Sequence, residues 1–169
     1  GKEIAKTLAV NGATVVVNDI NIVQAEKVAQ EIRSMGGQSL ALKADVTNFS
    51  EVERMMELVL EKFGTIDILV NNAGVLRRSR IEDIDEAEWN LVVNTNLKGT
   101  FNCSKAVTKI MKQRESGKIV NISSRAGRST SNFGGAHYTA AKAAFLGFTR
   151  HLAREMAPYR INVNAVCPG

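Results

Sequence analysis

The stretch "TVVVNDINIVQAEKVAQEIRSMGGQSLALKAD", residues 14–45, decides the class of fold. It opens with a run of β-branched residues, continues with apolar residues at helical spacing as far as Gly36 and Gly37, and closes in a second aliphatic run. Short continuous apolar runs are typical of buried strands, and apolar residues three and four apart are typical of an amphipathic helix. This order predicts two parallel strands joined by a crossover helix.

The same alternation continues through the rest of the chain. Further short apolar runs predict strands at 66–72, 118–123 and 161–167. Alternating strands and helices with continuous apolar strands indicate an α/β fold: a doubly wound parallel sheet of the Rossmann type with helices on both faces.

A second helix is predicted over "SEVERMMELVLEKF", residues 50–63. Ser50 and Glu53 have the spacing of a capping box, in which each side chain bonds a free amide of the first turn. Gly64 follows the last apolar residue and is expected to end the helix.

The chain of 169 residues, 44% of them hydrophobic, predicts one dinucleotide-binding domain spanning residues 1–169. It begins at Gly1 directly before a helical segment and stops at Gly169 directly after a strand. A dinucleotide fold needs a first strand and a glycine turn whose amides hold the pyrophosphate. We therefore expect this domain to be truncated at both ends, without the first strand and the C-terminal elements.

The charge distribution argues against a nucleic-acid partner. The formal net charge is +5, but the basic residues are dispersed and the few aromatic residues do not alternate with them. No apolar run approaches the roughly 18 residues that span a bilayer. The composition therefore predicts neither nucleic-acid nor membrane binding, and a cytoplasmic location is expected.

The two cysteines predict neither a disulfide nor a metal site. Cys103 and Cys167 lie far apart, without a C-x-x-C pattern and without a cluster that includes His137 or His151. We expect both cysteines to be small buried hydrophobic residues.

Polar or small residues follow the predicted strands. They are Asp19, Asp45, the "NNAG" at 71–74, Ser124, and Pro168 with Gly169. Ligands of open parallel sheets bind beyond the carboxyl ends of the strands, so these residues mark the predicted site.

Asp19 has two interpretations. At the end of the first visible strand it suits a carboxylate that accepts hydrogen bonds from the adenosine ribose of a dinucleotide, and such a carboxylate favours NAD over NADP. An aspartate at the same place also stabilises a turn before the next helix.

Tyr138 and Lys142 form the candidate reactive pair. They are four residues apart, so in a helix both side chains lie on one face. A phenol of pKa about 10 exchanges protons near pH 7 only if its anion is favoured by roughly 4 kcal/mol. A neighbouring ammonium contributes that much only where water is partly excluded. Glycines at 127, 134 and 135 allow the preceding loop to pack closely over such a pocket, and Ser124 follows a strand nearby.

Taken together, these segments resemble the short-chain dehydrogenase/reductase family over essentially the whole chain. The matching segments are Gly1, "DVT" at 45–47, "NNAG" at 71–74, "NTNLKGTF" at 94–101, "IVNISS" at 119–124, "YTAAK" at 138–142 and "INVNAVCPG" at 161–169. The resemblance implies a catalytic set of Asn96, Ser124, Tyr138 and Lys142. It implies cofactor binding by Gly1, Asp19, Asp45, Val46, Asn72, Ala73, Gly74, Tyr138, Lys142, Pro168 and Gly169.

The implied reaction is hydride transfer between nicotinamide and a carbonyl or secondary alcohol. In this scheme Tyr138 exchanges the proton, Ser124 orients the oxygen, Lys142 assists the tyrosine and holds the nicotinamide ribose, and Asn96 holds a relay water. Asn96 can also be interpreted as a structural residue that ties a helix kink to the backbone, and this role is compatible with the relay role.

The overall resemblance is greatest to the 3-oxoacyl-[acyl-carrier-protein] reductase type, which often uses NADPH, whereas Asp19 favours NAD. Arginines at 77, 78, 80, 125 and 128 follow two of the predicted strands and are expected at the same rim of the sheet. They suit an anionic substrate, such as a sugar acid or the arm of an acyl carrier, and solvated loop charge partly balanced by the acidic 82–88 segment is the simpler interpretation. Sugar, sugar-acid or other secondary-alcohol dehydrogenases are alternatives, as are a dinucleotide sensor and an inactive fragment. By resemblance the full-length protein is a homotetramer.

Overall fold

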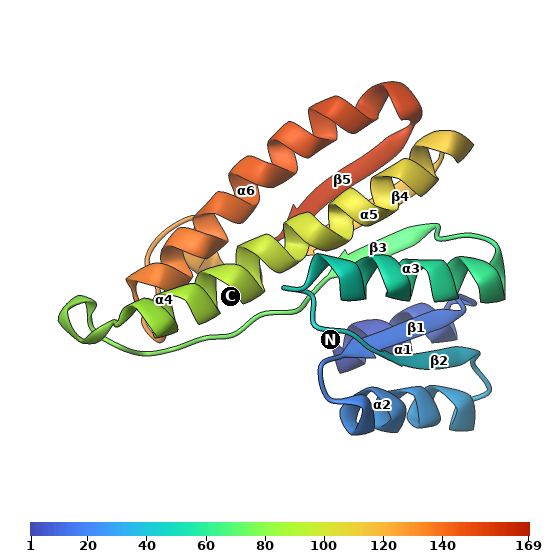
Figure 1. Ribbon diagram of the computed structural model, residues 1–169, viewed down its shortest axis with the longest axis horizontal. Coiled ribbons are helices and arrows are strands. Elements are labelled where there is room, and N and C mark those ends of the chain that lie inside the picture. Colours follow the sequence, from blue (N-terminus) through green and yellow to red (C-terminus); the bar gives the residue numbers. More distant parts are fainter.

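The computed structural model describes residues 1–169 and has the alternating strands and helices of an α/β fold (Figure 1). The strands are β1 (Val15–Asp19), β2 (Ser39–Lys43), β3 (Ile68–Asn71), β4 (Gly117–Ile122) and β5 (Ile161–Val166). The α-helices are α1 (Lys2–Val10), α2 (Ile22–Ser34), α3 (Phe49–Phe63), α4 (Glu86–Val93), α5 (Gly99–Arg114) and α6 (Ala136–Met156). The five predicted strands are all present, some of them shorter at their ends.

All strand pairs are parallel. Strand β2 pairs with β1, and β3, β4 and β5 form a separate three-stranded sheet in that order. From β1 the chain moves outwards to β2, and from β3 it moves outwards through β4 to β5, which is the doubly wound order. No hydrogen bond joins β1 to β3.

Helices lie on both faces of the strands. Helix α2 packs on β1 and β2. Helix α3 lies on the opposite side, where its Val52, Met55 and Met56 pack against Ala44, just beyond β2. Figure 1 shows β1 and β2 between these two helices. This arrangement confirms the predicted fold class.

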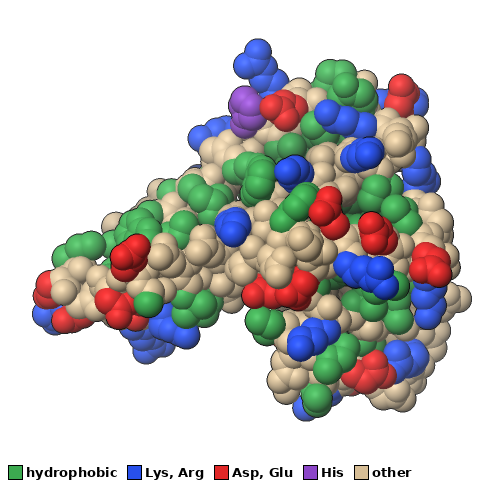
Figure 2. Space-filling model, in the orientation of Figure 1, with side chains coloured by type: hydrophobic (Ala, Val, Ile, Leu, Met, Phe, Trp, Pro, Cys, Tyr) green, Lys and Arg blue, Asp and Glu red, His purple; other side chains and the backbone are tan.

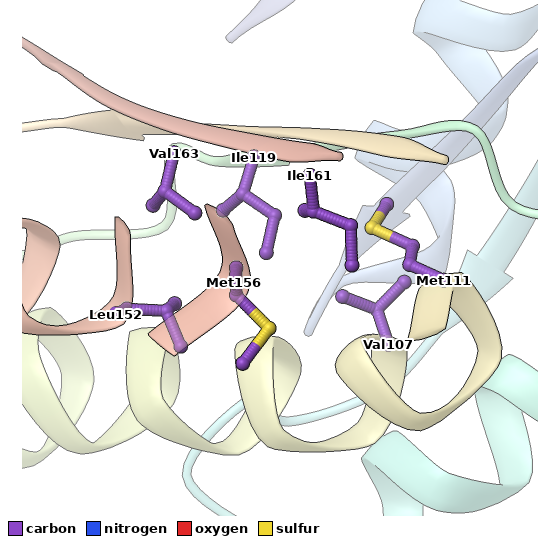
Figure 3. Close-up of a cluster of buried hydrophobic side chains, with 7 residues drawn as sticks. All are labelled: Val107, Met111, Ile119, Leu152, Met156, Ile161 and Val163. Carbon is purple, nitrogen blue, oxygen red and sulfur yellow. The ribbon is translucent and has the colours of Figure 1, made fainter. Parts of the chain in front are cut away.

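Helices α5 and α6 cover one face of the three-stranded sheet. Their shared core contains Val107 and Met111 of α5, Leu152 and Met156 of α6, and Ile119, Ile161 and Val163 of the strands. In Figure 3 the three strand residues point towards the four helical residues. Burying this apolar surface fixes both helices on the sheet, and these helices lead to the candidate site.

The predicted capping box of α3 is wrong. The helix begins at Phe49, and the side chain of Asn48 accepts hydrogen bonds from the amides of Ser50 and Glu51, at 3.1 and 3.4 Å. Asn48 is a favourable N-cap residue two positions earlier, so it satisfies the free amides and leaves no capping role for Ser50. Gly64 ends the helix as predicted, with a φ of 73°.

The prediction for the cysteines holds for one of the two. Cys103 is buried in α5, and burial raises the pKa of its thiol to about 12. Cys167 is partly exposed, because it lies beyond the last residue of β5.

None of the six α-helices has the length and the apolar composition that crossing a membrane requires.

Candidate active site

The segments that follow the strands meet at one edge of the molecule. A Cβ atom on Gly1 would lie 2.7 Å from Nδ2 of Asn72, and the amide of Arg125 donates to the carbonyl of Pro168 at 2.9 Å. In Figure 1 both chain termini and the segment after β3 lie near the middle of the view, between the part built on β1 and β2 and the arm that ends near α4. Figure 2 shows a notch in the outline between the arm that ends near α4 and the part built on β1 and β2.

Tyr138 and Lys142 lie together near the start of α6. The ammonium of Lys142 is 5.8 Å from the centre of the Tyr138 ring and 4.6 Å from the centre of the Phe145 ring. It donates a hydrogen bond to the carbonyl of Ile122 at 2.9 Å. Only 4% of Lys142 is exposed, and this burial lowers the pKa of its ammonium to about 8. At pH 7 the side chain is therefore still mostly cationic, in a water-poor setting where an ammonium acts strongly on a neighbouring phenol.

Asn96 lies in a π-helical turn, Asn94–Lys98, between α4 and α5. Its buried Nδ2 donates to the carbonyls of Val75 and Val92, at 2.7 and 2.8 Å, so the residue ties the turn to the backbone. Its Oδ1 is also buried and has no hydrogen-bond partner. A buried acceptor without a partner is costly, so this oxygen suits a donor brought by a water or a ligand.

Gly74 joins these groups into one site. A Cβ atom at Gly74 would lie 2.7 Å from Oδ1 of Asn96 and 3.6 Å from Nζ of Lys142. The amide oxygen and the ammonium therefore face the same point of the backbone after β3. Only glycine fits between them without displacing a neighbour.

The structure distinguishes the two adjacent serines. Ser123 is 5% exposed, and its hydroxyl donates to the carbonyl of Lys142 at 2.9 Å. The Oγ of Ser124 accepts from the amide of Ala126 at 3.1 Å, which leaves its own hydroxyl hydrogen available. Ser124 rather than Ser123 can thus donate to a bound oxygen.

The loop before α6 packs closely on the candidate pair. A Cβ atom at Gly127 would collide with the carbonyl of Lys142, and one at Gly134 would lie 2.5 Å from Cδ1 of Tyr138. Gly135 is equally confined, since its Cβ atom would lie 2.6 Å from the carbonyl of Ser79. The close packing expected from these three glycines is present.

Two of the predicted cofactor residues, Asp19 and Asp45, lie at or just beyond the ends of β1 and β2. Oδ1 of Asp19 accepts from the amide of Asn21 at 2.8 Å, so the turn interpretation is realised. Oδ1 of Asp45 accepts from both the amide and the hydroxyl of Thr47 at 2.8 Å. These local bonds tie each carboxylate to the residues that follow its strand.

Two residues that sequence reasoning missed hold Val46 in place. Asn102 of α5 donates through Nδ2 to the carbonyl of Val46 at 2.8 Å, and a Cβ atom on Gly99 would lie 2.6 Å from a methyl of Val46. Helix α5 therefore connects the loop after β2 to the turn that contains Asn96. No local pattern reveals this contact, because the partners lie far apart in the sequence.

A buried network of polar side chains near the ends of β3 and β4 was also not predicted from the sequence. Nδ2 of Asn71 donates to Oδ1 of Asn121 at 2.8 Å and to Oγ of Ser104 at 3.1 Å, and Nδ2 of Asn121 donates to Oγ1 of Thr149 at 2.9 Å. These bonds link β3 and β4 to α5 and α6. Because the members are satisfied and buried, the network fixes the strand ends relative to the two helices.

The five arginines are exposed and none forms an ion pair. The segment that contains Arg77 and the loop before α6 lie side by side, because the amide of Gly135 donates to the carbonyl of Arg77 at 2.8 Å. The guanidinium of Arg78 lies 5.5 Å from the centre of the Phe133 ring. Figure 2 shows acidic as well as basic side chains at the end of the arm near α4, so solvated loop charge remains a sufficient interpretation.

The comparisons with known proteins agree with this geometry. Residues 1–169 match the family described as short chain dehydrogenase. The chain is 44% identical over 170 residues to a 3-oxoacyl-[acyl-carrier-protein] reductase of Synechocystis sp., covering 100% of this chain and 68% of that protein.

Two solved structures are similar throughout this chain. A 3-oxoacyl-[acyl-carrier protein] reductase with bound NAD from Brucella melitensis has a TM-score of 0.94 and 35% identity, and 66% of its chain is covered. A metagenomic short-chain oxidoreductase in complex with NADP has a TM-score of 0.94 and 32% identity, and 76% of its chain is covered. The present chain thus spans from about two thirds to three quarters of the length of these relatives.

Proposed function

The chain belongs to the short chain dehydrogenase family, and on that premise we propose that the protein reduces a 3-oxoacyl thioester with a nicotinamide dinucleotide. The observation that carries this proposal is the convergence of Lys142 and Asn96 on the backbone at Gly74, with the Tyr138 ring beside the Lys142 ammonium. When bound, the dinucleotide supplies the hydride that the carbonyl carbon receives.

Tyr138 gives the carbonyl oxygen its proton. The buried Lys142 ammonium favours the tyrosinate that remains, because charge interactions are strong where water is excluded. The free hydroxyl hydrogen of Ser124 stabilises the charge that develops on the same oxygen.

Asn96 completes a path for the proton. Its unpartnered Oδ1 faces the same position as the Lys142 ammonium and can accept a hydrogen bond from a water there. Such a water would pass protons from solvent to Lys142 and so renew Tyr138 after each turnover. The bonds from Nδ2 to the backbone keep the acceptor aimed at this place.

The residues at the strand ends suit a dinucleotide. We assign its binding to Gly1, Asp19, Asp45, Val46, Asn72, Ala73, Gly74, Tyr138, Lys142, Pro168 and Gly169. Gly1 precedes α1 without a side-chain cap, so the first amides of that helix remain free to hold a phosphate. The exposed carboxylate of Asp19 would accept a hydrogen bond from a ribose hydroxyl. The same carboxylate would repel the 2′-phosphate of NADP, so NAD is favoured over NADP.

Two observations support an acyl-thioester substrate: the similarity to 3-oxoacyl-[acyl-carrier-protein] reductases and the exposed arginines. Arg125 and Arg128 are exposed beside Ser124, where positive charge would attract an anionic carrier arm. Replacing both with Gln should raise KM for an anionic thioester and leave KM for a neutral ketone unchanged. If the replacement leaves KM unchanged for both substrates, the arginines do not bind a carrier arm, and a sugar or other secondary-alcohol dehydrogenase is favoured.

We further propose that residues 1–169 form one dinucleotide-binding domain of a homotetramer. Helices α4 and α5 expose large apolar side chains, including Leu91 at 45% and Phe101 at 46%. Sedimentation of the full-length protein tests this assembly, and a monomer would contradict it.

The reaction is tested by following nicotinamide absorbance in the full-length protein with NADH and NADPH. The substrates are an acetoacetyl thioester, a keto-sugar and a simple ketone, each also tried with Tyr138→Phe. Turnover that the variant lacks supports the proposal. Dinucleotide binding without turnover in either protein would favour a sensor.

A further inference from the structure

His137, the residue directly before Tyr138, makes a buried contact that the proposed chemistry does not use. Its ring is fully buried, and its Nε2 lies 3.0 Å from Oε1 of Glu88 on α4. The ring stacks on Trp89, with centroids 6.3 Å apart and planes at 26°. Gly135 closes the other side, where a Cβ atom would lie 2.7 Å from Cε1 of the ring. The imidazole thus occupies a closely fitted slot between α4 and the start of α6.

The chemistry of this contact favours one tautomer. Nδ1 of His137 is buried and has no hydrogen-bond partner. A proton on Nδ1 would be a buried donor without an acceptor, whereas a proton on Nε2 donates to the Glu88 carboxylate. Glu88 lies in the first turn of α4, where the helix dipole favours its negative charge. The result is a charge-assisted hydrogen bond between two helices.

The two helices carry different parts of the proposed proton path. Helix α4 continues directly into the turn that contains Asn96, and the carbonyl of its Val92 accepts a bond from that side chain. Helix α6 carries Tyr138 and Lys142. A shift of α4 along α6 would therefore change how Asn96 faces the Lys142 ammonium.

We propose that His137 and Glu88 are positioning residues, which hold the start of α6 against α4 so that Tyr138, Lys142 and Asn96 keep their alignment. This inference rests on the proposed reductase function. His137 and Glu88 lie far apart in the sequence and meet only because α6 packs on α4, so their hydrogen bond holds the two helices in a fixed relative position. Neither residue is assigned a contact with substrate or dinucleotide.

The test compares variants that break the bond with variants that keep it, in the full-length protein. Glu88→Leu removes the acceptor from a side chain that is 24% exposed, so the fold should tolerate it, and Glu88→Gln retains an acceptor oxygen. His137→Gln keeps an amide donor in place of Nε2–H. His151→Leu is the matched control, because it removes the exposed histidine–glutamate pair on the same helix, which also spans 3.0 Å.

Glu88→Leu should lower kcat by about tenfold with KM for the dinucleotide unchanged, because misplaced reacting groups slow the chemical step. Glu88→Gln and His137→Gln should recover most of the lost kcat, and His151→Leu should match the unaltered protein. An unaltered kcat in Glu88→Leu, with only a lower Tm, would show that His137 and Glu88 do not position the reacting groups, and it would leave the reductase proposal standing. Absence of turnover in the unaltered protein itself would overturn both.

Discussion

The ammonium of Lys142 lies 5.8 Å from the centre of the Tyr138 ring, on the same face of α6. It is nearly excluded from water, and its hydrogen bond to the carbonyl of Ile122 fixes it on the end of β4. A cation held in this way can act on the phenol with little screening. This arrangement and the site around it affect quantities that can be measured: the free energy of unfolding, the kcat of substituted proteins and the preference between NADH and NADPH.

The buried Lys142 ammonium should make stability depend on pH in a defined window. Burial lowers its pKa from 10.5 in the unfolded chain to about 8 in the folded protein. Between these values the unfolded state binds more protons, so the free energy of unfolding should rise with pH. Relative to Lys142→Met, the unliganded protein should gain up to about 3 kcal/mol across this window.

Denaturant titrations of the two proteins from pH 7 upwards measure this difference. Lys109→Met, which removes an exposed lysine of α5, is the control for a change in net charge. A difference between the unaltered protein and Lys142→Met that stays constant through the window would refute the buried-cation interpretation.

Gly74→Ala should damage the site, because the added methyl would lie 2.7 Å from Oδ1 of Asn96. Asn96 is fully buried and bonded to the backbone, so it cannot move away freely. We expect kcat to fall by about tenfold or more through misalignment. Steady-state kinetics of the full-length protein provide the measurement.

The matched control is Gly147→Ala in the middle of α6, where the nearest atom to the new methyl, apart from its chain neighbours and the backbone of its own helix, is a guanidinium nitrogen of Arg150 at 4.0 Å. This change should leave kcat unaltered and raise stability by roughly 1 kcal/mol, because alanine favours helix. Similar kcat values for the two variants would contradict the assigned role of Gly74.

Asp19→Asn separates the two interpretations of Asp19. Asparagine keeps an oxygen that can accept from the amide of Asn21, so the turn and the Tm should persist. Loss of the negative charge should move the ratio of kcat/KM values from NADH towards NADPH by about tenfold. If the ratio does not move, Asp19 stabilises the turn and does not select the cofactor.

The features that follow from local spacing were predictable. The parallel strands follow from short apolar runs, and the Tyr138–Lys142 pair follows from the helical repeat, which places residues four apart on one face. The close packing of Gly127, Gly134 and Gly135 was anticipated because glycine alone allows the backbone to approach so closely.

The features that depend on packing between distant segments were not predictable. Gly74, Asn96 and Lys142 meet only after β3, the π-helical turn and α6 have assembled. The bond from His137 to Glu88 likewise depends on how α4 crosses α6. The capping prediction for α3 failed for a local reason, because Asn48 competes for the same free amides as Ser50.

The central claim is that Tyr138 delivers the proton to the carbonyl oxygen. Its most direct test is the rate of acetoacetyl-thioester reduction by full-length Tyr138→Phe, measured beside its dinucleotide affinity. We predict a fall in kcat of about 10²- to 10⁴-fold, the usual effect of removing a general acid, with a much smaller loss of dinucleotide affinity because the other assigned contacts remain. A phenylalanine variant that reduces the thioester at the unaltered rate would contradict the account.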